Sequence, residues 1–471
     1  MVLVMIKIFN TLTRKKEILK PVKDKKIGLY TCGPTVYDSA HIGNFRTYVW
    51  QDVMKRWLTY KGFKVKHVMN LTDVDDKTIK GSRKEGIRLT EYTERYAKAF
   101  FEDMKSLNIV PADVFPKATE HIGEMVEMVK TLIKKGAAYR TEDGIYFDIS
   151  KFKSYGQLSK LKIKELKAGA RVRSDLYNKD EVQDFALWKF WDSEDGDVFW
   201  DTEIGKGRPG WHLECSAMSM KYLGETFDLH TGGIDLMFPH HENEIAQSEA
   251  ATGKKFVKYW LHGEHMLVDG QKMSKSLGNF YTLRDVLKKG YDPKIVRYLL
   301  LSASFKQKLN FTFQSMDAAK NTFESLSNFM SRLKDVSGKN NPAVKKMIAK
   351  VKKEFGGAMD NNLNMNNALA SLFKFIGDIN KLIDSGKIGK KDAKDVVAVM
   401  AELDEILGLG LGESTKKGKI SEEAKKLIEK REKARKAGDY KTADELRKKL
   451  KDEFGIILED TKKGIKWKKV S

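Results

Sequence analysis

Cysteine and proline are scarce in this chain, which has two cysteines and eight prolines among 471 residues. Cys32 and Cys215 are far apart in the sequence, so a disulfide framework is excluded and a reducing compartment is expected. Long apolar runs are also missing. The run that opens the chain is too short for a signal peptide, and no other run could span a membrane. We therefore expect a cytoplasmic protein that has no membrane partner.

Two common nucleotide-binding motifs are absent as well. The chain has neither GxGxxG nor the Walker sequence GxxxxGK[ST], which argues against a dinucleotide-binding fold and against a P-loop enzyme. Acidic residues are fewer than basic ones, 65 against 87, and the net charge is +22. This excess has two explanations, a generally lysine-rich protein or a polyanionic partner such as nucleic acid.

The most informative pattern lies between Leu29 and Asp76. A short apolar run over residues 26–32, stopped by Gly-Pro, predicts a buried strand. Apolar residues at helical spacing over residues 45–58 predict a helix with a broad buried face, and residues 65–71 suit a second strand. Such a β-α-β unit favours a parallel sheet.

Polar residues stand where such a sheet binds its ligands. In parallel sheets ligands bind beyond the carboxyl ends of the strands. Cys32 and Thr72 follow the two predicted strands. His41 and Asn44 belong to the segment HIGN that opens the helix, where free N–H groups and the helix dipole favour an anion. The sequence therefore predicts a phosphate-like ligand at this corner, although HIGN alone is also compatible with an ordinary helix cap.

A second group of residues has the types that bind a metal. His240 and Glu244 are four apart and share a helix face, but His241 and Glu244 are three apart and would serve as well. Adding Cys32 and Cys215 gives sulfur, nitrogen and oxygen donors whose mixed softness suits zinc. The alternative is that both cysteines are buried small hydrophobes and that the histidine-rich helix is solvated.

The segment KMSKS, Lys272 to Ser276, lies between Gly270 and Gly278. Two lysines and two serines between glycines predict a mobile cationic loop that could close on a triphosphate and stabilise charge in the transition state. The alternative is a solvated basic turn.

Together these motifs resemble the class I aminoacyl-tRNA synthetases and, within that class, the cysteinyl-tRNA synthetase family. The class resemblance is carried by AHIGN and KMSKS, and the family resemblance by YTCGPTVYDSAHIGN, NLTDVDDK, GRPGWHLECSAM, GGIDLMFPHHENE, QKMSKSLGN and the terminal ILEDT. These segments cover nearly the whole chain. One position departs from the class pattern, because Asn44 stands where a second histidine is usual.

The resemblance implies a role for each matching residue. It implies that Cys32, Cys215, His240 and Glu244 bind one Zn²⁺ that holds the thiol of L-cysteine, which selects His240 over His241. It implies that the amino-acid pocket is lined by Gly33, Thr72, Trp211 and Asp235, with Asp235 opposite the ammonium group. ATP and its Mg²⁺ are expected at His41, Asn44 and Lys275, and Lys272 is expected to join these three in catalysis.

The last fifty-one residues form a small basic module, with helices expected over Glu422 to Lys436 and Tyr440 to Phe454 and a hairpin around Lys463-Gly464. The resemblance implies that this module reads the anticodon of tRNA(Cys). The residues whose types suit contacts with unpaired bases are Arg435, Tyr440, Asp444, Asp460 and Trp467. The alternative for Trp467 is a place in the core of the hairpin.

The expected fold is α/β: a Rossmann-like, doubly wound parallel-sheet catalytic domain, then a helical bundle and a small mixed α/β module. We expect the catalytic domain over residues 1–137 and 207–285, with an inserted connective subdomain over residues 138–206. A helical tRNA-binding domain over residues 286–410 and the anticodon-binding module over residues 411–471 follow. The inserted segment looks too short for a hydrolytic editing domain, and we expect a monomer.

Two other functions remain to be distinguished. A cysteine ligase of the same catalytic fold, which joins activated cysteine to an amino sugar, would share the core motifs and lack the terminal module. A non-catalytic zinc-containing RNA-binding protein would not need HIGN and KMSKS. The presence of the module and of both motifs favours a synthetase that uses ATP to charge tRNA with cysteine.

Overall fold

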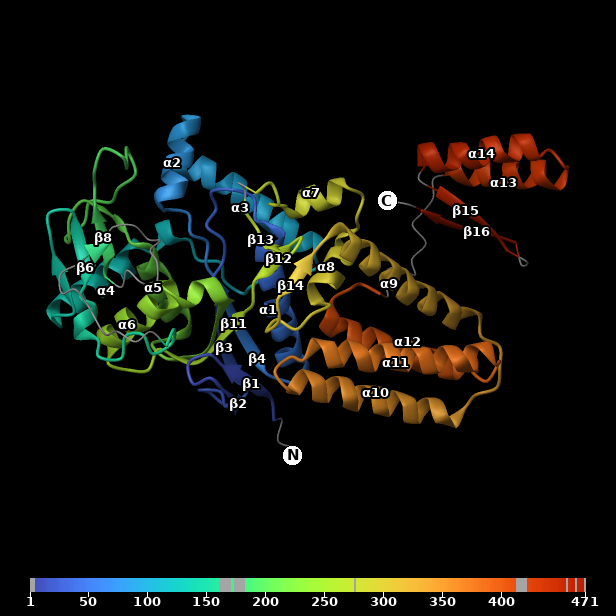
Figure 1. The fold of residues 1–471 in the computed structure, drawn as a ribbon, viewed down its shortest axis with the longest axis horizontal. Coiled ribbons are helices and arrows are strands. Elements are labelled where there is room, and N and C mark those ends of the chain that lie inside the picture. Colours follow the sequence, from blue (N-terminus) through green and yellow to red (C-terminus); the bar gives the residue numbers. More distant parts are fainter. Residues whose placement is uncertain are drawn as a thin grey trace.

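The computed structural model describes residues 5–160, 171–172, 183–274, 277–411, 422–454, 456–461 and 464–469. At its centre lies a four-stranded sheet in the order β11-β10-β3-β4, in which every neighbouring pair is parallel (Figure 1). The strands are β3 (Lys26–Thr31), β4 (Lys64–Met69), β10 (Phe227–Gly233) and β11 (Val257–Gly263). The predicted β-α-β unit and its parallel pairing are therefore confirmed.

Helices cover both faces of this sheet. Helix α1 (Ile42–Tyr60) packs on one face, and α5 (Trp211–Leu223) and α6 (His240–Thr252) pack on the other (Figure 1). The buried stripe of α1 contains Phe45, Val49 and Val53, as the helical spacing predicted. The chain leaves β3 toward β4 on one side, whereas β10 and β11 extend the sheet on the other. The strand order thus reverses between β3 and β10, which is where doubly wound sheets bind ligands.

An inserted sheet lies beside this core and contains β5 (Ala138–Arg140), β6 (Gly144–Phe147), β7 (Arg171–Val172), β8 (Asp184–Phe190) and β9 (Gly207–Pro209). Strand β9 follows the stretch expected to be inserted, yet it pairs with β8. Before the insert come the hairpin β1 (Lys7–Asn10) and β2 (Lys15–Ile18) and the helices α2 (Asp76–Glu85), α3 (Leu89–Ser106) and α4 (Ile122–Lys134).

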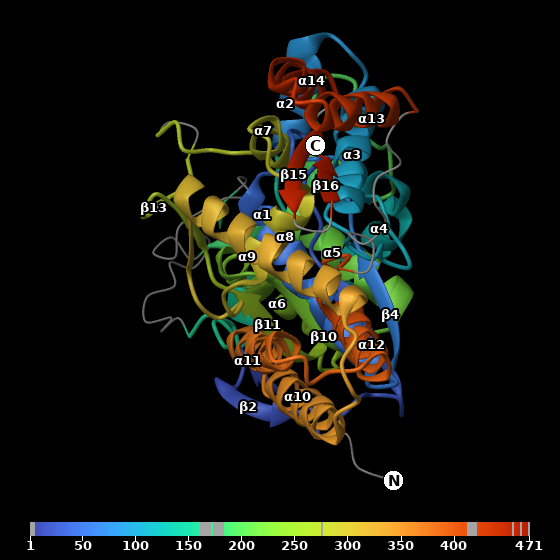
Figure 2. The same cartoon turned by 90° about the vertical axis from the view of Figure 1, so that its right-hand side faces the viewer.

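The second half of the chain is mainly helical, with a small three-stranded sheet at its start. That sheet contains β12 (Met266–Val268), β13 (Gln271–Lys272) and β14 (Leu309–Phe311). Strand β14 interrupts a region expected to be helical throughout, because a three-residue strand has no periodicity of its own to detect. The helices are α7 (Leu283–Lys288), α8 (Pro293–Leu301), α9 (Phe313–Arg332), α10 (Pro342–Asp360), α11 (Met365–Asp384) and α12 (Lys390–Leu407), and Figure 2 shows α10 beside α11.

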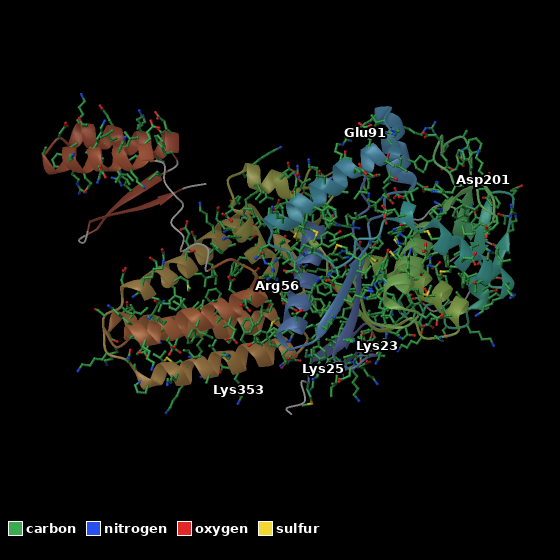
Figure 3. All side chains as sticks on the ribbon, turned by 180° about the vertical axis from the view of Figure 1, so that it is seen from behind. Lys23, Lys25, Arg56, Glu91, Asp201 and Lys353 are labelled. Atoms are coloured by element: carbon green, nitrogen blue, oxygen red, sulfur yellow. The ribbon has the colours of Figure 1, made fainter. Side chains whose placement is uncertain are left out.

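Buried polar contacts join these helices to α1. The Arg297 guanidinium on α8 is fully buried; it donates to Asp52 Oδ2 on α1 at 2.5 Å and to the Leu407 carbonyl of α12 at 2.8 Å. Arg56, labelled in Figure 3, also binds Asp52 and donates to the Glu405 carbonyl at 2.9 Å. Because both arginines bind the Asp52 carboxylate and also donate to carbonyls of α12, these contacts fix α8 and α12 against α1.

The terminal module has a small core of its own. Its elements are α13 (Glu422–Lys436), α14 (Tyr440–Phe454), β15 (Ile456–Thr461) and β16 (Gly464–Lys469), so both helices have the predicted bounds. Ala424, Leu450, Ile456 and Leu458 form the buried cluster. In the described part of the chain, no helix is both long and apolar enough to cross a membrane.

Candidate active site

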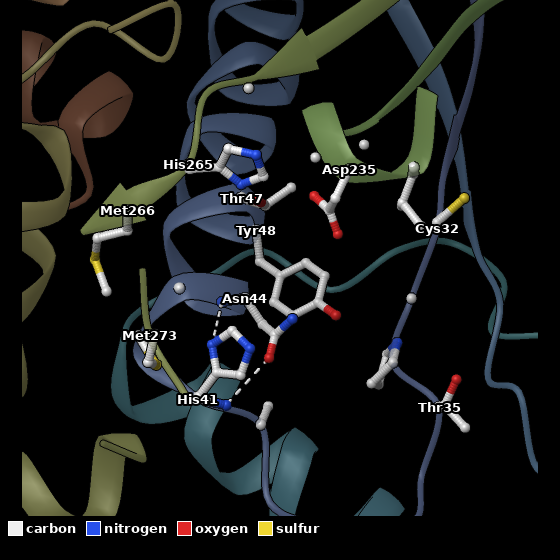
Figure 4. A pocket seen from close by; sticks show the side chains of 18 of the residues that line it. Cys32, Thr35, His41, Asn44, Thr47, Tyr48, Asp235, His265, Met266 and Met273 are labelled. Atoms are coloured by element: carbon white, nitrogen blue, oxygen red, sulfur yellow. Dashed lines mark hydrogen bonds between the residues drawn. The ribbon is translucent and has the colours of Figure 1, made fainter. Parts of the chain in front are cut away.

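A cavity of about 410 Å³ opens at the carboxyl ends of β3 and β10, where the strand order reverses. Seven residues expected at the site line it: Cys32, Gly33, His41, Asn44, Trp211, Asp235 and Lys272. Figure 4 shows His41 and Asn44 on one side of the cavity and Cys32 on the other, with Asp235 and Tyr48 between them. Segments that are far apart in the sequence therefore meet at the predicted edge of the sheet.

His41 and Asn44 cap the start of α1 reciprocally. The Asn44 backbone N–H donates to His41 Nδ1 at 3.2 Å, and the His41 backbone N–H donates to Asn44 Oδ1 at 3.1 Å. This capping box holds the His41 ring at the wall of the pocket. The asparagine that stands in place of a second histidine thus organises the helix N-terminus instead of adding positive charge.

Cys32, Cys215, His240 and Glu244 converge behind the pocket. Their four ligand atoms lie within 4.8 Å of one another, and all four residues are buried. Glu244 Oε1 has no hydrogen-bond partner among the described residues, although His240 Nε2 lies 3.1 Å away. Buried donor atoms that converge from separate segments fit a metal ion, and the two sulfurs, one nitrogen and one oxygen suit zinc.

A second set of donors shares two of these residues. Cys32, His230, His241 and Glu244 also lie within 4.8 Å of one another. His241, which spacing could not exclude, places Nε2 3.3 Å from Cys32 Sγ. His230, which was not predicted, places Nε2 2.9 Å from Glu244 Oε2. Neighbours of this kind orient the ligands of a metal site.

Burial controls the protonation of the cluster. It raises the pKa of the Cys32 thiol well above its ordinary value, and the adjacent Cys215 adds to the rise. It also raises the pKa of the Glu244 carboxyl to about 8, against the opposing effect of His240. A bound cation would reverse both tendencies by stabilising the thiolate and the carboxylate.

The other buried histidines extend this cluster away from the pocket. His241 Nδ1 lies 2.8 Å from His262 Nε2, and His262 Nδ1 lies 2.9 Å from Thr11 Oγ1. Burial lowers the pKa of His230, His241 and His262 well below the ordinary value, so these rings are neutral. The sequence signal for this network was the density of histidines, since six of the nine lie between His212 and His265.

Thr72, which was expected to line the amino-acid pocket, is buried and is not among the residues that line the cavity. Its hydroxyl donates to Glu214 Oε2 at 2.9 Å and accepts from Asn70 Nδ2 at 3.1 Å. Asn70 Oδ1 in turn accepts from the Gly33 N–H at 2.9 Å. Asn70, Thr72 and Glu214 therefore hold the backbone next to Cys32 in place. Asn70 and Glu214 were not predicted, because only the folded chain brings them together.

Lys272 ends β13 and lines the pocket with Met273. Asn279 closes the loop that follows: its Oδ1 accepts from the Ser274 N–H at 2.8 Å, and its Nδ2 donates to the Lys272 carbonyl at 3.2 Å. Lys275, the other lysine expected at ATP, lies outside the described residues.

Comparison with family models divides the chain into three matches. Residues 18–321 match the model described as tRNA synthetases class I (C) catalytic domain, residues 354–412 match a DALR domain, and residues 417–467 match a cysteinyl-tRNA ligase anticodon binding domain. A cysteine–tRNA ligase of Protochlamydia amoebophila is 48% identical over 98% of both chains. The chain belongs to the cysteine–tRNA ligase family.

A second family member, from Brachyspira hyodysenteriae, is 46% identical over 98% of both chains. Among solved structures, a Mycobacterium tuberculosis methionyl-tRNA synthetase in complex with methionyl-adenylate matches with a TM-score of 0.64. The match covers 83% of this chain and 93% of that chain at 15% identity, so it bears on the fold alone. The class I catalytic fold is thereby confirmed.

The residues expected to read the anticodon lie in the module that matches the anticodon-binding domain of the cysteine–tRNA ligase family. Arg435 and Asp444 are exposed, and Tyr440 is 67% exposed at the start of α14. Asp460 lies in β15 opposite Ile465, and Trp467 lies opposite Leu458. The side chains of Asp460 and Trp467 lie outside the described part.

We expect Gly33→Ala to lower the free energy of unfolding by about 2–3 kcal/mol and to weaken cysteine binding, because the backbone has no room for a side chain. A Cβ at this position would lie 1.8 Å from the Asn70 carbonyl oxygen. The control is Gly123→Ala in α4, where a Cβ would meet nothing within 4 Å. Denaturant unfolding and the KM for cysteine test the expectation, and equal behaviour of the two variants would contradict it.

Proposed function

We propose that this member of the cysteine–tRNA ligase family binds one Zn²⁺ through Cys32, Cys215, His240 and Glu244. The observation that supports the proposal is the convergence of four buried donor atoms next to a pocket that Cys32 lines. A zinc ion at this position would bind the thiol of L-cysteine as a thiolate. Trp211 and Asp235 line the pocket beyond the cluster, where Asp235 would pair with the ammonium group of the amino acid.

The first step would be activation of cysteine by ATP. The cysteine carboxylate attacks the α-phosphorus of ATP, cysteinyl-adenylate forms, and pyrophosphate leaves. His41, the N-terminus of α1, Lys272 and Lys275 would position the phosphates and stabilise charge in the transition state. Mg²⁺ bound with ATP would neutralise part of the phosphate charge. Asn44 would contribute by holding the His41 ring through the capping box.

The second step would be transfer to tRNA(Cys). A hydroxyl of the terminal ribose attacks the acyl carbon of the adenylate, an ester bond forms, and AMP leaves. Residues 286–410 would bind the tRNA, and residues 411–471 would read its anticodon through Arg435, Tyr440, Asp444 and Asp460. We also propose that the protein acts as a monomer in the cytoplasm.

One pair of assays tests this proposal on the full-length protein. Cysteine-dependent exchange of pyrophosphate into ATP measures activation, and attachment of labelled cysteine to tRNA measures transfer. Both reactions are expected to require zinc, as chelation and re-addition of the metal would reveal. Exchange without tRNA charging would instead favour the ligase that joins cysteine to an amino sugar, and the absence of exchange would refute the activation step.

Removal of residues 421–471 is expected to lower tRNA charging by about 10²-fold and to leave cysteine-dependent exchange nearly unchanged, because contacts with the anticodon would be lost. The cut should spare the bundle, since Leu409 and Leu411 are buried and their N–H groups donate to Asp404 at 2.8 and 2.7 Å. The double variant Arg435→Ala, Tyr440→Ala keeps the module and should show a smaller loss. If the truncated chain charged tRNA as well as the full chain, the module would not read the anticodon.

A further inference from the structure

A lysine that the proposed activation of cysteine by ATP does not use also borders the pocket. Lys77, in the first turn of α2, lines the cavity together with Tyr37 and Asp38. Helix α2 follows β4 at one edge of the central sheet, whereas Lys272 comes after β11 at the other edge. Cations from opposite edges of the sheet therefore border one cavity.

The position of Lys77 is well defined. Its ammonium group lies 5.0 Å from the centroid of the Tyr37 ring, a distance typical of cation–π contacts. The Tyr37 carbonyl accepts a hydrogen bond from the Tyr92 hydroxyl on α3 at 2.7 Å. That hydroxyl passes over Gly81 of α2, where a Cβ would lie only 2.2 Å from it. Helices α2 and α3 thus fix the aromatic platform on which the lysine rests.

The same turn of α2 also holds the inserted sheet. Asp76 forms ion pairs with Lys189 of β8 at 3.2 Å and with Arg208 of β9 at 2.6 Å. Lys77 therefore lies between the pocket and the inserted sheet. Among the described residues the Lys77 ammonium group contacts the neutral Tyr37 ring and pairs with no carboxylate, so its charge is available to an anionic ligand.

We propose that Lys77 binds a backbone phosphate of the single-stranded 3′ end of the tRNA as that end enters the pocket. This inference rests on the proposed function. The transfer step must bring the terminal ribose to the adenylate, and a strand that enters a pocket is held mainly through its phosphates. His41 and Lys272 serve the ATP phosphates in the proposed activation step, whereas Lys77 lies on the side of the inserted sheet. A lysine binds phosphate as a point charge and needs no fixed fork geometry.

Lys77→Ala tests the proposal against Lys80→Ala, which removes an exposed lysine from the same helix outside the pocket lining. The measurements are cysteine-dependent pyrophosphate exchange and the rate of transfer from preformed adenylate to tRNA. We expect Lys77→Ala to lower transfer by about tenfold, to change exchange far less, and to reduce the salt dependence of tRNA binding by about one unit of slope. Lys77→Arg should restore most of the transfer rate, and Lys80→Ala should match the unmodified protein.

Two results would overturn the inference while the proposed function stands. One is normal transfer by Lys77→Ala, and the other is an equal loss of exchange and transfer, which would assign Lys77 to ATP or cysteine. Absence of cysteine-dependent exchange in the unmodified protein would instead overturn the proposed function, and this inference with it.

Discussion

Cys215→Ala is expected to lower cysteine-dependent adenylate formation by about 10³-fold or more, because it removes both a donor and a negative charge from the proposed zinc site. Cys215 is 1% exposed on α5, and its sulfur belongs to the group of four donors within 4.8 Å. Three donors would remain, and burial leaves the Glu244 carboxyl with a pKa of about 8. Without a bound cation the thiol of the substrate would have no partner at the base of the pocket.

The measurements are the zinc content of the purified variant and its rate of pyrophosphate exchange at increasing cysteine. Ser219→Ala is the matched control, since Ser219 is buried on the same helix and its hydroxyl donates to the Ser216 carbonyl of that helix at 3.1 Å. The control should keep both zinc and activity. A zinc-free protein that activated cysteine at the full rate would refute the role assigned to the cluster.

Serine is expected to be activated about 10⁴-fold or more less efficiently than cysteine, as judged by kcat/KM in pyrophosphate exchange. Serine has nearly the shape of cysteine, so a pocket lined by Trp211 and Asp235 cannot exclude it by size. The difference would come from the metal, because a thiol that binds zinc would lose its proton to solvent far more readily than a hydroxyl would. The protein would therefore reject serine by its chemistry and would not need a second, hydrolytic site to remove it from tRNA.

A suitable comparison substrate is α-aminobutyrate, which keeps the size of cysteine and replaces the thiol by a methyl group. If the metal selects the substrate, α-aminobutyrate and serine should both be poor substrates. The protein should also not hydrolyse tRNA(Cys) that has been mischarged with serine. Ready exchange with serine would refute selection by the metal. Rapid hydrolysis of seryl-tRNA would show that the inserted sheet, or another part of the chain, has an editing activity.

Local sequence determined the elements whose pattern lies within one segment. The apolar spacing of α1 predicted its buried face, and the pattern of the last fifty-one residues predicted the bounds of α13 and α14. The strands β9 and β14 were missed because three residues carry too little pattern. The motifs are local patterns too. AHIGN and KMSKS indicated the class I synthetases, and the longer segments such as GRPGWHLECSAM and GGIDLMFPHHENE indicated the cysteinyl-tRNA synthetase family.

Only the tertiary structure decided which residues meet across the molecule. Spacing alone allowed His240 and His241 equally, and the folded chain places both near Glu244, His240 with Cys215 and His241 with His230. Asn70 and Glu214 support Gly33 and Thr72 through hydrogen bonds between segments far apart in sequence. Lys77 lines the pocket because the first turn of α2 lies at its rim, where the neighbouring Asp76 binds Lys189 and Arg208 of the inserted sheet. Such contacts depend on how whole elements pack against one another, and residue types along one segment carry no information about that packing.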